Sequence, residues 1–213
     1  MQRSRDPMSL FTPTADALLR AFIALGLSAP LVLMVTLMLA ARSPLANGIN
    51  ASVRQPVQFD HRHHVADDGI DCLYCHDAAT KSATAGIPPT SRCMGCHAQI
   101  WPRSQKLAVV RNSFFEDRSI AWNKVHRLPD FVFFDHSVHV KGGVGCVTCH
   151  GRVDQMAVLE QVAPLSMQWC LDCHRDPTPH LRPREEITSM TWEPSGAPVA
   201  SVHPRTECTT CHR

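Results

Sequence analysis

The sequence predicts a mostly irregular fold with short α-helices and one apolar helix near the N-terminus. Five copies of the motif Cys-x-x-Cys-His use all ten cysteines of the 213-residue chain. Aromatic residues make up only 6% of the chain and there are 16 prolines, a composition that is poor for an ordinary packed core. Residues 21–41 form a run without a charge. We therefore expect loops and short helices wrapped around covalently attached groups, preceded by one transmembrane helix.

The motif Cys-x-x-Cys-His is typical of covalent haem attachment. Two thiols add across the vinyl groups of one porphyrin, and the adjacent histidine becomes the proximal ligand of the iron. A disulfide framework would not need a histidine after every second cysteine, and a zinc site would pair one Cys-x-x-Cys with another. The sequence therefore predicts five covalently bound haem c groups. The predicted thioether cysteines are Cys72, Cys75, Cys93, Cys96, Cys146, Cys149, Cys170, Cys173, Cys208 and Cys211, and the predicted proximal histidines are His76, His97, His150, His174 and His212.

The apolar run predicts a membrane anchor. It is long enough to cross a bilayer as one helix, since about 20 residues are needed. Arg3, Arg5 and Arg20 precede the run and Arg42 follows it, so the positive-inside rule leaves the N-terminus in the cytoplasm. The alternative is a secretory signal peptide cleaved after the run, although the apolar region of a signal peptide is usually shorter.

These observations predict three parts of the chain. We expect a cytoplasmic N-terminus at 1–17, a transmembrane anchor helix at 18–42, and a pentahaem cytochrome c domain at 43–213 on the periplasmic face of a bacterial inner membrane.

An internal duplication predicts distal ligands. The segment Phe-Asp-His-x-x-His-Val occurs twice, each time followed by two haem motifs, so the repeat covers residues 59–97 and 134–174, and the fifth motif at 208–212 stands outside it. Histidines three apart lie on one face of a helical turn and can serve two neighbouring irons. A low-spin haem needs a sixth ligand from His or Met. We expect the first histidine of each pair to serve the motif immediately following. The distal ligands predicted from the repeat are His61, His64, His136 and His139.

The fifth haem needs a distal ligand from outside the repeat. His126, just ahead of the second unit, is the predicted ligand, and Met167 is the alternative. His63 breaks the spacing and has no counterpart in the second unit, where Val138 stands, so we interpret it as a surface residue or haem-propionate partner. The remaining candidates for the fifth haem are Met156, Met190, His180 and His203.

Other segments carry weaker predictions. Residues 106–115 have helix-compatible spacing, and residues 176–205 hold six prolines and predict an extended surface connection. Charge is nearly balanced, with 21 Lys and Arg against 19 Asp and Glu, so no nucleic-acid partner is expected. No Gly-rich phosphate loop, serine nucleophile motif or metalloprotease helix is present, and we expect no catalytic residue.

The motifs together resemble a known family. The repeated Phe-Asp-His-x-x-His-Val, Gly-Ile-Pro-Pro-Thr at 86–90, Leu-Pro-Asp-Phe-Val at 128–132 and the segments 143–153 and 169–175 resemble the pentahaem cytochrome c subunit of bacterial alternative complex III. This resemblance covers residues 18–213. More distantly, the His-x-x-His placement resembles class III cytochromes of the c3 and c7 type. The resemblance implies a class III-like fold that is mostly irregular, α-rich and wrapped around the haems.

The resemblance also implies a function and partners. Complexes of this family oxidise quinol in respiration or photosynthesis, and this chain would relay electrons from an iron–sulfur subunit to a cytochrome c or another periplasmic acceptor. The implied partners are the membrane, that iron–sulfur subunit, multi-spanning quinol-binding subunits and a monohaem cytochrome c. Because all five motifs end in His and spare histidines supply distal ligands, we expect electron transfer and no substrate chemistry. The alternative is a self-sufficient single-anchor quinol dehydrogenase that feeds a periplasmic reductase.

Overall fold

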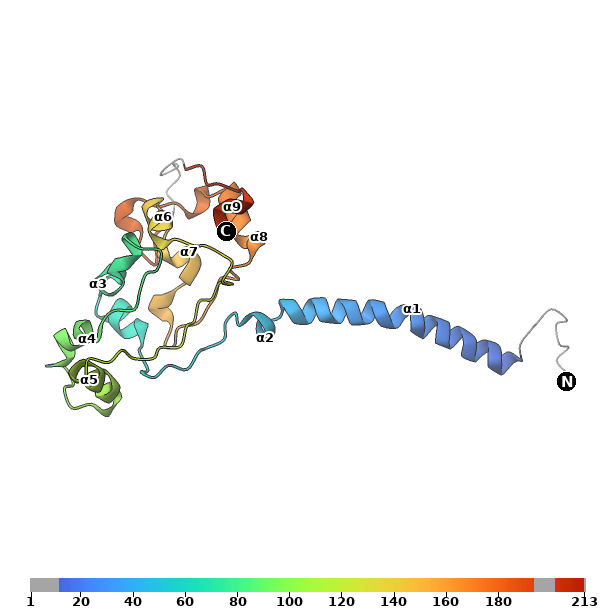
Figure 1. Cartoon of the computed structure of the whole chain (residues 1–213), viewed down its shortest axis with the longest axis horizontal. Helices are drawn as coiled ribbons and strands as arrows, with labels where there is room; N and C mark the ends of the chain where they lie inside the picture. The colour runs from blue at the N-terminus through green and yellow to red at the C-terminus, as the bar shows by residue number, and fades with distance from the viewer. Residues whose placement is uncertain (1–11, 194–201, 213) are drawn as a thin grey trace. The chain divides into compact units, whose positions relative to one another are not determined.

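The computed structural model describes residues 12–193 and 202–212. The chain divides into two compact units, Met1–Gly48 and Ile49–Arg213. The first unit contains a long helix, α1 (Pro13–Arg42), and a single turn, α2 (Pro44–Asn47). The second unit is built from short helices joined by irregular segments (Figure 1).

Helix α1 begins and ends where its sequence signals lie. The Thr12 side chain accepts a hydrogen bond from the Ala15 backbone N–H at 3.3 Å, and Pro13 occupies the first helical turn, where its missing N–H costs nothing. Asp16 in the first turn forms an ion pair with Arg20 at 2.9 Å, and Arg42 lies in the last turn, which suits the helix dipole at both ends. The helix therefore starts five residues before the predicted anchor and ends with it.

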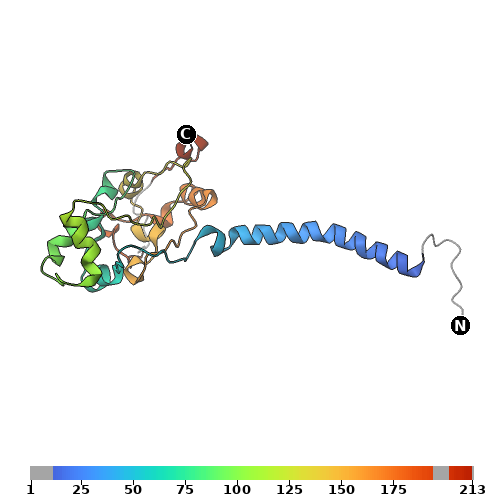
Figure 2. The same ribbon diagram turned by 60° about the horizontal axis from the view of Figure 1, so that its bottom comes forward.

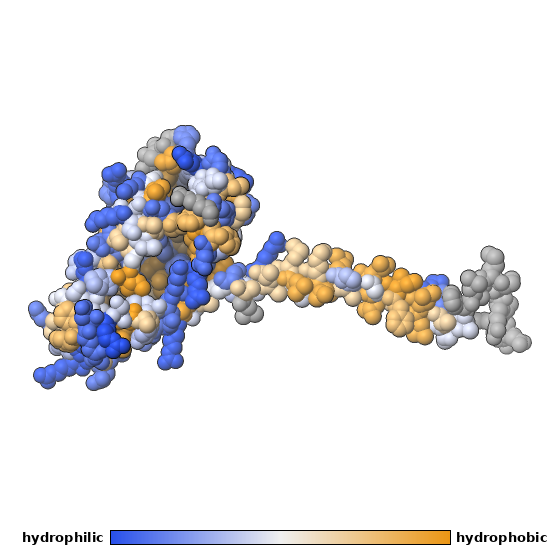
Figure 3. All heavy atoms as spheres, viewed as in Figure 1, coloured by the Kyte–Doolittle hydropathy of each residue, from blue (hydrophilic) through white to orange (hydrophobic). Residues whose placement is uncertain are grey.

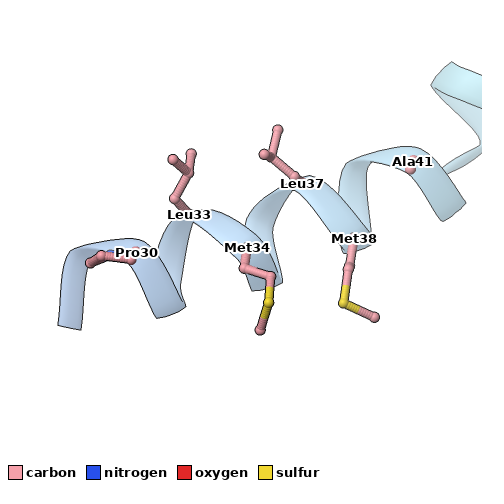
Figure 4. A pocket seen from close by; sticks show the side chains of 6 residues that line it. All are labelled: Pro30, Leu33, Met34, Leu37, Met38 and Ala41. Carbon is pink, nitrogen blue, oxygen red and sulfur yellow. The ribbon is translucent and has the colours of Figure 1, made fainter. Parts of the chain in front are cut away.

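Apolar side chains cover α1 on all sides. The apolar colour follows most of its visible face (Figure 3), and Leu33 and Leu37 point to the side opposite Met34 and Met38 (Figure 4). The polar exceptions satisfy themselves within the helix, as when the Thr36 hydroxyl donates to the Val32 carbonyl at 2.8 Å. In the described part of the chain, α1 is the one helix long and apolar enough to cross a membrane, a property that a membrane anchor and a signal sequence share.

The helices of the second unit are short. The α-helices are α3 (Cys72–Cys75), α4 (Thr90–His97), α5 (Ala108–Phe115), α6 (His136–Lys141), α7 (Cys146–His150), α8 (Met167–Arg175) and α9 (Cys208–Cys211). A π-helical turn, η1 (Arg62–Asp67), and 3₁₀ turns, η2 (Asp77–Thr80), η3 (Gln105–Leu107), η4 (Val153–Gln155), η5 (Thr178–His180) and η6 (Arg184–Glu186), complete the set. Among the residues described there is no β-strand, only two isolated bridges, Ile49–Gln161 and Val144–Leu181. Long irregular connections separate the short helices in both views (Figures 1 and 2).

Every Cys-x-x-Cys-His motif lies on or directly after one of these helices, and local sequence explains the helix ends. Asp71 starts α3 by accepting the Leu73 N–H at 2.7 Å, and Ser166 starts α8 by accepting the Trp169 N–H at 3.3 Å. Gly151 ends α7 at φ +68°, where a Cβ atom would come within 2.7 Å of Val162. One helical turn is enough to bring the two thiols of a motif onto one side of the backbone.

Apolar packing within the second unit is sparse. The main cluster joins Val57, Met94 and Val110, with Cys93 and Trp122 against its edge. It holds α5, the helix predicted over 106–115, against α4 and the second haem motif. No large side chain in the described residues is fully buried, in agreement with the low aromatic content. The protein's own side chains therefore provide only a small part of the interior.

The expected irregular connection over 176–205 is confirmed for the described residues 176–193 and 202–205, apart from the single turns η5 and η6, but two of its side chains are buried and not at the surface. Leu181 is 3% exposed and Ile187 is 7% exposed, and both pack inward. The Ile187 carbonyl accepts the Cys146 N–H at 3.0 Å, and Leu181 forms a bridge with Val144. Outside the turns η5 and η6 the segment is irregular, and its free backbone groups can donate and accept hydrogen bonds with the haem motifs.

Candidate haem-binding site

All ten cysteines lie in the described residues, and all are free thiols with no disulfide among them. Eight are partly buried, while Cys96 of the second motif and Cys208 of the fifth are exposed. No three His, Cys, Asp or Glu side chains converge on a metal-binding point within 12–193 and 202–212. A structural zinc site would bring three or four such side chains to one point, and a disulfide would join two of the sulfurs; the described residues show neither arrangement.

Backbone carbonyls orient four of the five histidines predicted to be proximal ligands. Because a carbonyl only accepts, each of these four rings carries its proton on Nδ1 and keeps the Nε2 lone pair free for a metal. The Nδ1–H of His76 donates to the Gly86 carbonyl at 2.8 Å, and that of His97 to the Ile100 carbonyl at 3.0 Å. The Nδ1–H of His174 donates to the Arg205 carbonyl at 2.7 Å, and that of His212 to the Phe131 carbonyl at 3.2 Å. Hydrogen bonding of the outer nitrogen is typical of metal-ligating histidine.

The first repeat unit builds a compact group of rings around Phe59. The Phe59 ring stacks on His64, with centroids 4.4 Å apart and planes at 23°, and meets His61 edge-on at 4.7 Å and 82°. His64 Nδ1–H donates to the Asp60 carbonyl at 3.0 Å. One aromatic side chain thus fixes both histidines, and the two imidazoles point in different directions.

The second unit reproduces this geometry. Phe134 stacks on His139 at 4.4 Å and 28°, and meets His136 edge-on at 4.7 Å and 86°. His139 Nδ1–H donates to the Asp135 carbonyl at 2.7 Å, as His64 does to Asp60. His136 differs from His61 in having a carbonyl partner, Ala83 O, at 3.0 Å. The sequence duplication is therefore a structural duplication, in which phenylalanine has a defined role.

Three pairs of imidazole rings lie at a common distance, with planes at 68°, 50° and 12° in the order given next. Ring centroids are 6.2 Å apart for His64 and His97, 6.1 Å for His139 and His174, and 6.4 Å for His136 and His150. An imidazole nitrogen binds a metal at about 2 Å, and the ring centre lies about 1.2 Å behind it, so two imidazoles on opposite sides of one iron have centres about 6 Å apart. These pairs have the spacing that bis-histidine ligation requires.

Unlike His64, His136 and His139, His61 has no backbone carbonyl as a hydrogen-bond partner. Its Nδ1 is buried without a hydrogen bond, and burial, with smaller contributions from His76 and His64, lowers the pKa of His61 to about 4. A buried nitrogen left without a partner is costly unless something else binds the ring. The neutral imidazole beside His76 is thus in the protonation state that a metal ligand needs.

His126 lies against the third motif. Its Nε2 is 3.3 Å from His150 Nδ1, and the ring centroids are 4.4 Å apart at 75°. Burial lowers the pKa of His150 to about 3 and also lowers the pKa of His126. His126 therefore occupies the place that a backbone carbonyl takes in the other motifs. Its predicted role as distal ligand of the fifth haem stays a prediction.

His63 and Met167 lie at the surface, whereas Met156, Met190 and His180 are partly buried. His63 is half exposed, approaches Asp67 at 3.3 Å and stacks on Trp101 with centroids 6.0 Å apart and planes at 4°. Met167 is 63% exposed at the start of α8. The ring of the neighbouring His64 lies 5.7 Å from that of His63, with planes at 83°, but these two residues are adjacent in the chain and neither belongs to a haem motif.

The donor set fits haem c. Each motif supplies two free thiols and a histidine, and four of the five histidines have Nδ1 bound to a carbonyl. For three motifs, a second imidazole lies at a spacing that would suit a sixth iron ligand. Sequence reasoning missed the carbonyl acceptors and the contact between His126 and His150. The role of Phe59 and Phe134 had a signal, because both belong to the repeated segment.

Comparisons with known proteins agree with this chemistry. Residues 132–213 match the family described as cytochrome c7 and related cytochrome c. Over 97 residues the chain is 33% identical to a protein of Nitratidesulfovibrio vulgaris described as "Menaquinone reductase, multiheme cytochrome c subunit". The match covers 45% of this chain and 45% of that relative, so the chain spans less than half of the relative's length in the alignment.

The chain is thus similar to multihaem c-type cytochromes over its C-terminal part, and its described residues are helical and irregular, without strands. Covalently bound haem c is the cofactor that this similarity implies for its Cys-x-x-Cys-His motifs.

Proposed function

We propose that this chain is a membrane-anchored pentahaem electron-transfer subunit of a quinol-oxidising complex of the alternative complex III type. The observation that carries the proposal is the set of imidazole pairs 6.1–6.4 Å apart in a duplicated frame. Six-coordinate haems have no open axial position for a substrate, so such a frame suits electron transfer and not catalysis. The relative, described as a subunit of a menaquinone reductase, supports a quinone-linked complex.

In this proposal the chain holds five haem c groups through its ten cysteines. The proximal nitrogens are the Nε2 atoms of His76, His97, His150, His174 and His212. His64 is the distal partner for the second motif and His139 for the fourth, each oriented by a carbonyl and a stacked phenylalanine. His136 is the proposed distal partner for the third motif, with its ring 6.4 Å from that of His150, and His61, beside His76, is the proposed partner for the first. When bound, each haem provides a site that is reduced and reoxidised by one electron.

The proposed arrangement in the membrane has residues 1–17 in the cytoplasm, 18–42 as the anchor and 43–213 on the periplasmic side of the inner membrane. The support is the all-round apolar surface of α1 and the excess of arginine before it. This orientation agrees with haem attachment outside the cytoplasm. That compartment is oxidising, so the free cysteines of the apo-chain must be joined to haem before they oxidise.

The proposed partners follow from what the anchor lacks. Oxidation of one quinol releases two electrons and two protons, and residues 21–41 contain no titratable group that could accept a proton. Quinol binding and proton release therefore belong to multi-spanning partner subunits. An iron–sulfur subunit would deliver the electrons to this chain, and a monohaem cytochrome c or another periplasmic acceptor would take them up.

A second candidate is the same relay in the opposite direction. The relative's description is that of a menaquinone reductase, in which electrons would travel toward the quinone. The arrangement of ligands is compatible with either direction, because electron transfer between bis-histidine sites is reversible. Supplying the assembled complex first with menaquinol and an oxidised cytochrome c, and then with menaquinone and a reduced cytochrome, distinguishes the two by the faster reaction.

The test of the main proposal uses two preparations of the haem-loaded protein. Intact mass under denaturing conditions should show five haems added to the 23.6 kDa polypeptide, because thioether bonds survive unfolding. In stopped-flow mixing with a menaquinol analogue, the purified single chain should be reduced negligibly, while the assembled complex is reduced rapidly. Dithionite, which needs no quinol site, serves as the control and should reduce both. Rapid reduction of the single chain by menaquinol would favour the self-sufficient dehydrogenase.

A further inference from the structure

The five attachment motifs touch one another through a small set of contacts, and these contacts have an order. The second motif adjoins the first. The Arg92 guanidinium, one residue before the second motif, lies 4.9 Å over the ring of Tyr74, which is inside the first. Cys75 of the first motif is also close enough to Cys93 for its charge to contribute to the raised pKa of Cys93, after burial.

The first motif also adjoins the third. The Cys72 thiol is 3.9 Å from the Thr188 carbonyl, and the Cys146 N–H donates to the neighbouring Ile187 carbonyl at 3.0 Å, so one extended segment holds both motifs. The Cys146 side chain lies close enough to be the largest cause of the raised pKa of the Cys72 thiol. Since each sulfur bonds to a porphyrin edge when haem is attached, neighbouring thiols bring two porphyrin edges side by side.

The third motif adjoins the fourth. The N–H of Gly145, directly before the third motif, points to the carbonyl of His180, six residues after the fourth, at 3.4 Å. In the same region Val144 and Leu181 form a bridge. Burial raises the pKa of the Cys149 thiol to about 11, with Cys173 of the fourth motif adding to the effect.

The fourth motif in turn adjoins the fifth. His174 Nδ1–H donates to the carbonyl of Arg205, three residues before Cys208, at 2.7 Å. The Cys211 charge is among the causes, after burial, of the raised pKa of Cys170. Of all ten cysteines, the two exposed ones are Cys96 and Cys208, in the second and fifth motifs.

We propose that the five haem motifs stand in space in the order second, first, third, fourth, fifth, so that the second and fifth motifs are the two ends at which other redox centres exchange electrons with the chain. The two repeat units meet through the first and third motifs, which are the leading motif of each unit. Along this line of haems, the motifs of the first unit therefore come in the reverse of their sequence order. The fifth motif, outside the repeat, extends the line at the end of the second unit. This inference rests on the proposed function, because an order of haems presupposes that all five motifs are loaded.

The experiment locates the irons in the haem-loaded full-length chain, either within its complex by electron cryo-microscopy or in crystals by iron anomalous scattering. Thioether bonds assign each iron to a motif without reference to activity. The expected result is that the irons of the second and fifth motifs form the most widely separated pair, and that the irons of the first and third motifs are neighbours. The order would be overturned by a second-motif iron beside the fifth, or by another iron between the first and the third.

The same preparation separates this inference from the proposed function. An intact mass with fewer than five haems would contradict the pentahaem assignment. The positions of the remaining irons would still show whether the stated order holds. A mass with five haems and a different order would leave the electron-transfer function intact and refute only the inference.

Discussion

Replacing His64 tests the ligand assignment most directly. The His64 ring faces His97 at 6.2 Å and is held by the Asp60 carbonyl and the Phe59 ring. His64→Ala removes this imidazole but no cysteine, so all five haems should stay attached. One of five irons should lose its sixth ligand, which converts about a fifth of the low-spin signal to high spin. Loss of the ring stack should also reduce the free energy of unfolding by about 0.5–1.5 kcal/mol.

The neighbouring histidine provides the control. His63→Ala changes the same kind of side chain one residue away, but His63 is half exposed and faces Asp67 and Trp101. This variant should keep all five haems low-spin. Electron paramagnetic resonance at low temperature measures the spin states, and denatured mass counts the haems. A His64→Ala protein that stays fully low-spin, or a His63→Ala protein that gains the high-spin signal, would refute the assignment.

Three further substitutions probe other parts of the site. His126→Ala should leave five haems attached and convert about one of them to high spin. If all five haems stay low-spin and one midpoint potential shifts, His126 acts on His150 through their 3.3 Å contact. Met167 then becomes the preferred ligand of the fifth haem. Arg92→Gln should lower the midpoint potentials of two haems in a redox titration, because the positive charge of Arg92 beside the first and second motifs disfavours their oxidised form. The control Arg118→Gln changes a far more exposed arginine and should shift no potential measurably. A shift confined to one haem after Arg92→Gln would contradict the contact between the first and second motifs. Val110→Ala should reduce the free energy of unfolding by about 1–3 kcal/mol in denaturant titration. Val110 is 3% exposed and packs on Met94, which lies between the two cysteines of the second motif. Val109→Ala, on the exposed side of α5, is the control and should have little effect.

Features with a local signal could be predicted from the sequence. The apolar run predicts the long helix, and the structure extends it back only to Pro13. The repeated Phe-Asp-His-x-x-His-Val predicts two equivalent groups of histidines, and Phe59 and Phe134 hold their rings in matching geometry. Both cases depend on residues close together in the chain, where spacing determines which side chains meet.

Features formed between distant irregular segments could not be predicted in this way. The contacts of Ile187 and Thr188 with the first and third motifs join residues about 40 and more than 100 positions apart, through carbonyl oxygens that every residue type possesses. Such bonds leave no pattern in the side chains. The contact between His126 and His150 is of the same long-range kind, so the sequence indicated a free histidine but not the ring beside it.

The carbonyl partners of the histidines limit how this protein can change by mutation. His64, His76, His97, His136, His139, His174 and His212 each donate to a main-chain oxygen. No single amino-acid replacement deletes a main-chain oxygen, so the tautomer at these positions is insensitive to substitution of the partner residue. His150 is different, because its neighbour is the side chain of His126. A single substitution of His126 removes this partner altogether, so the tautomer of His150 depends on a side chain, whereas the tautomer of the other seven histidines depends on the main chain.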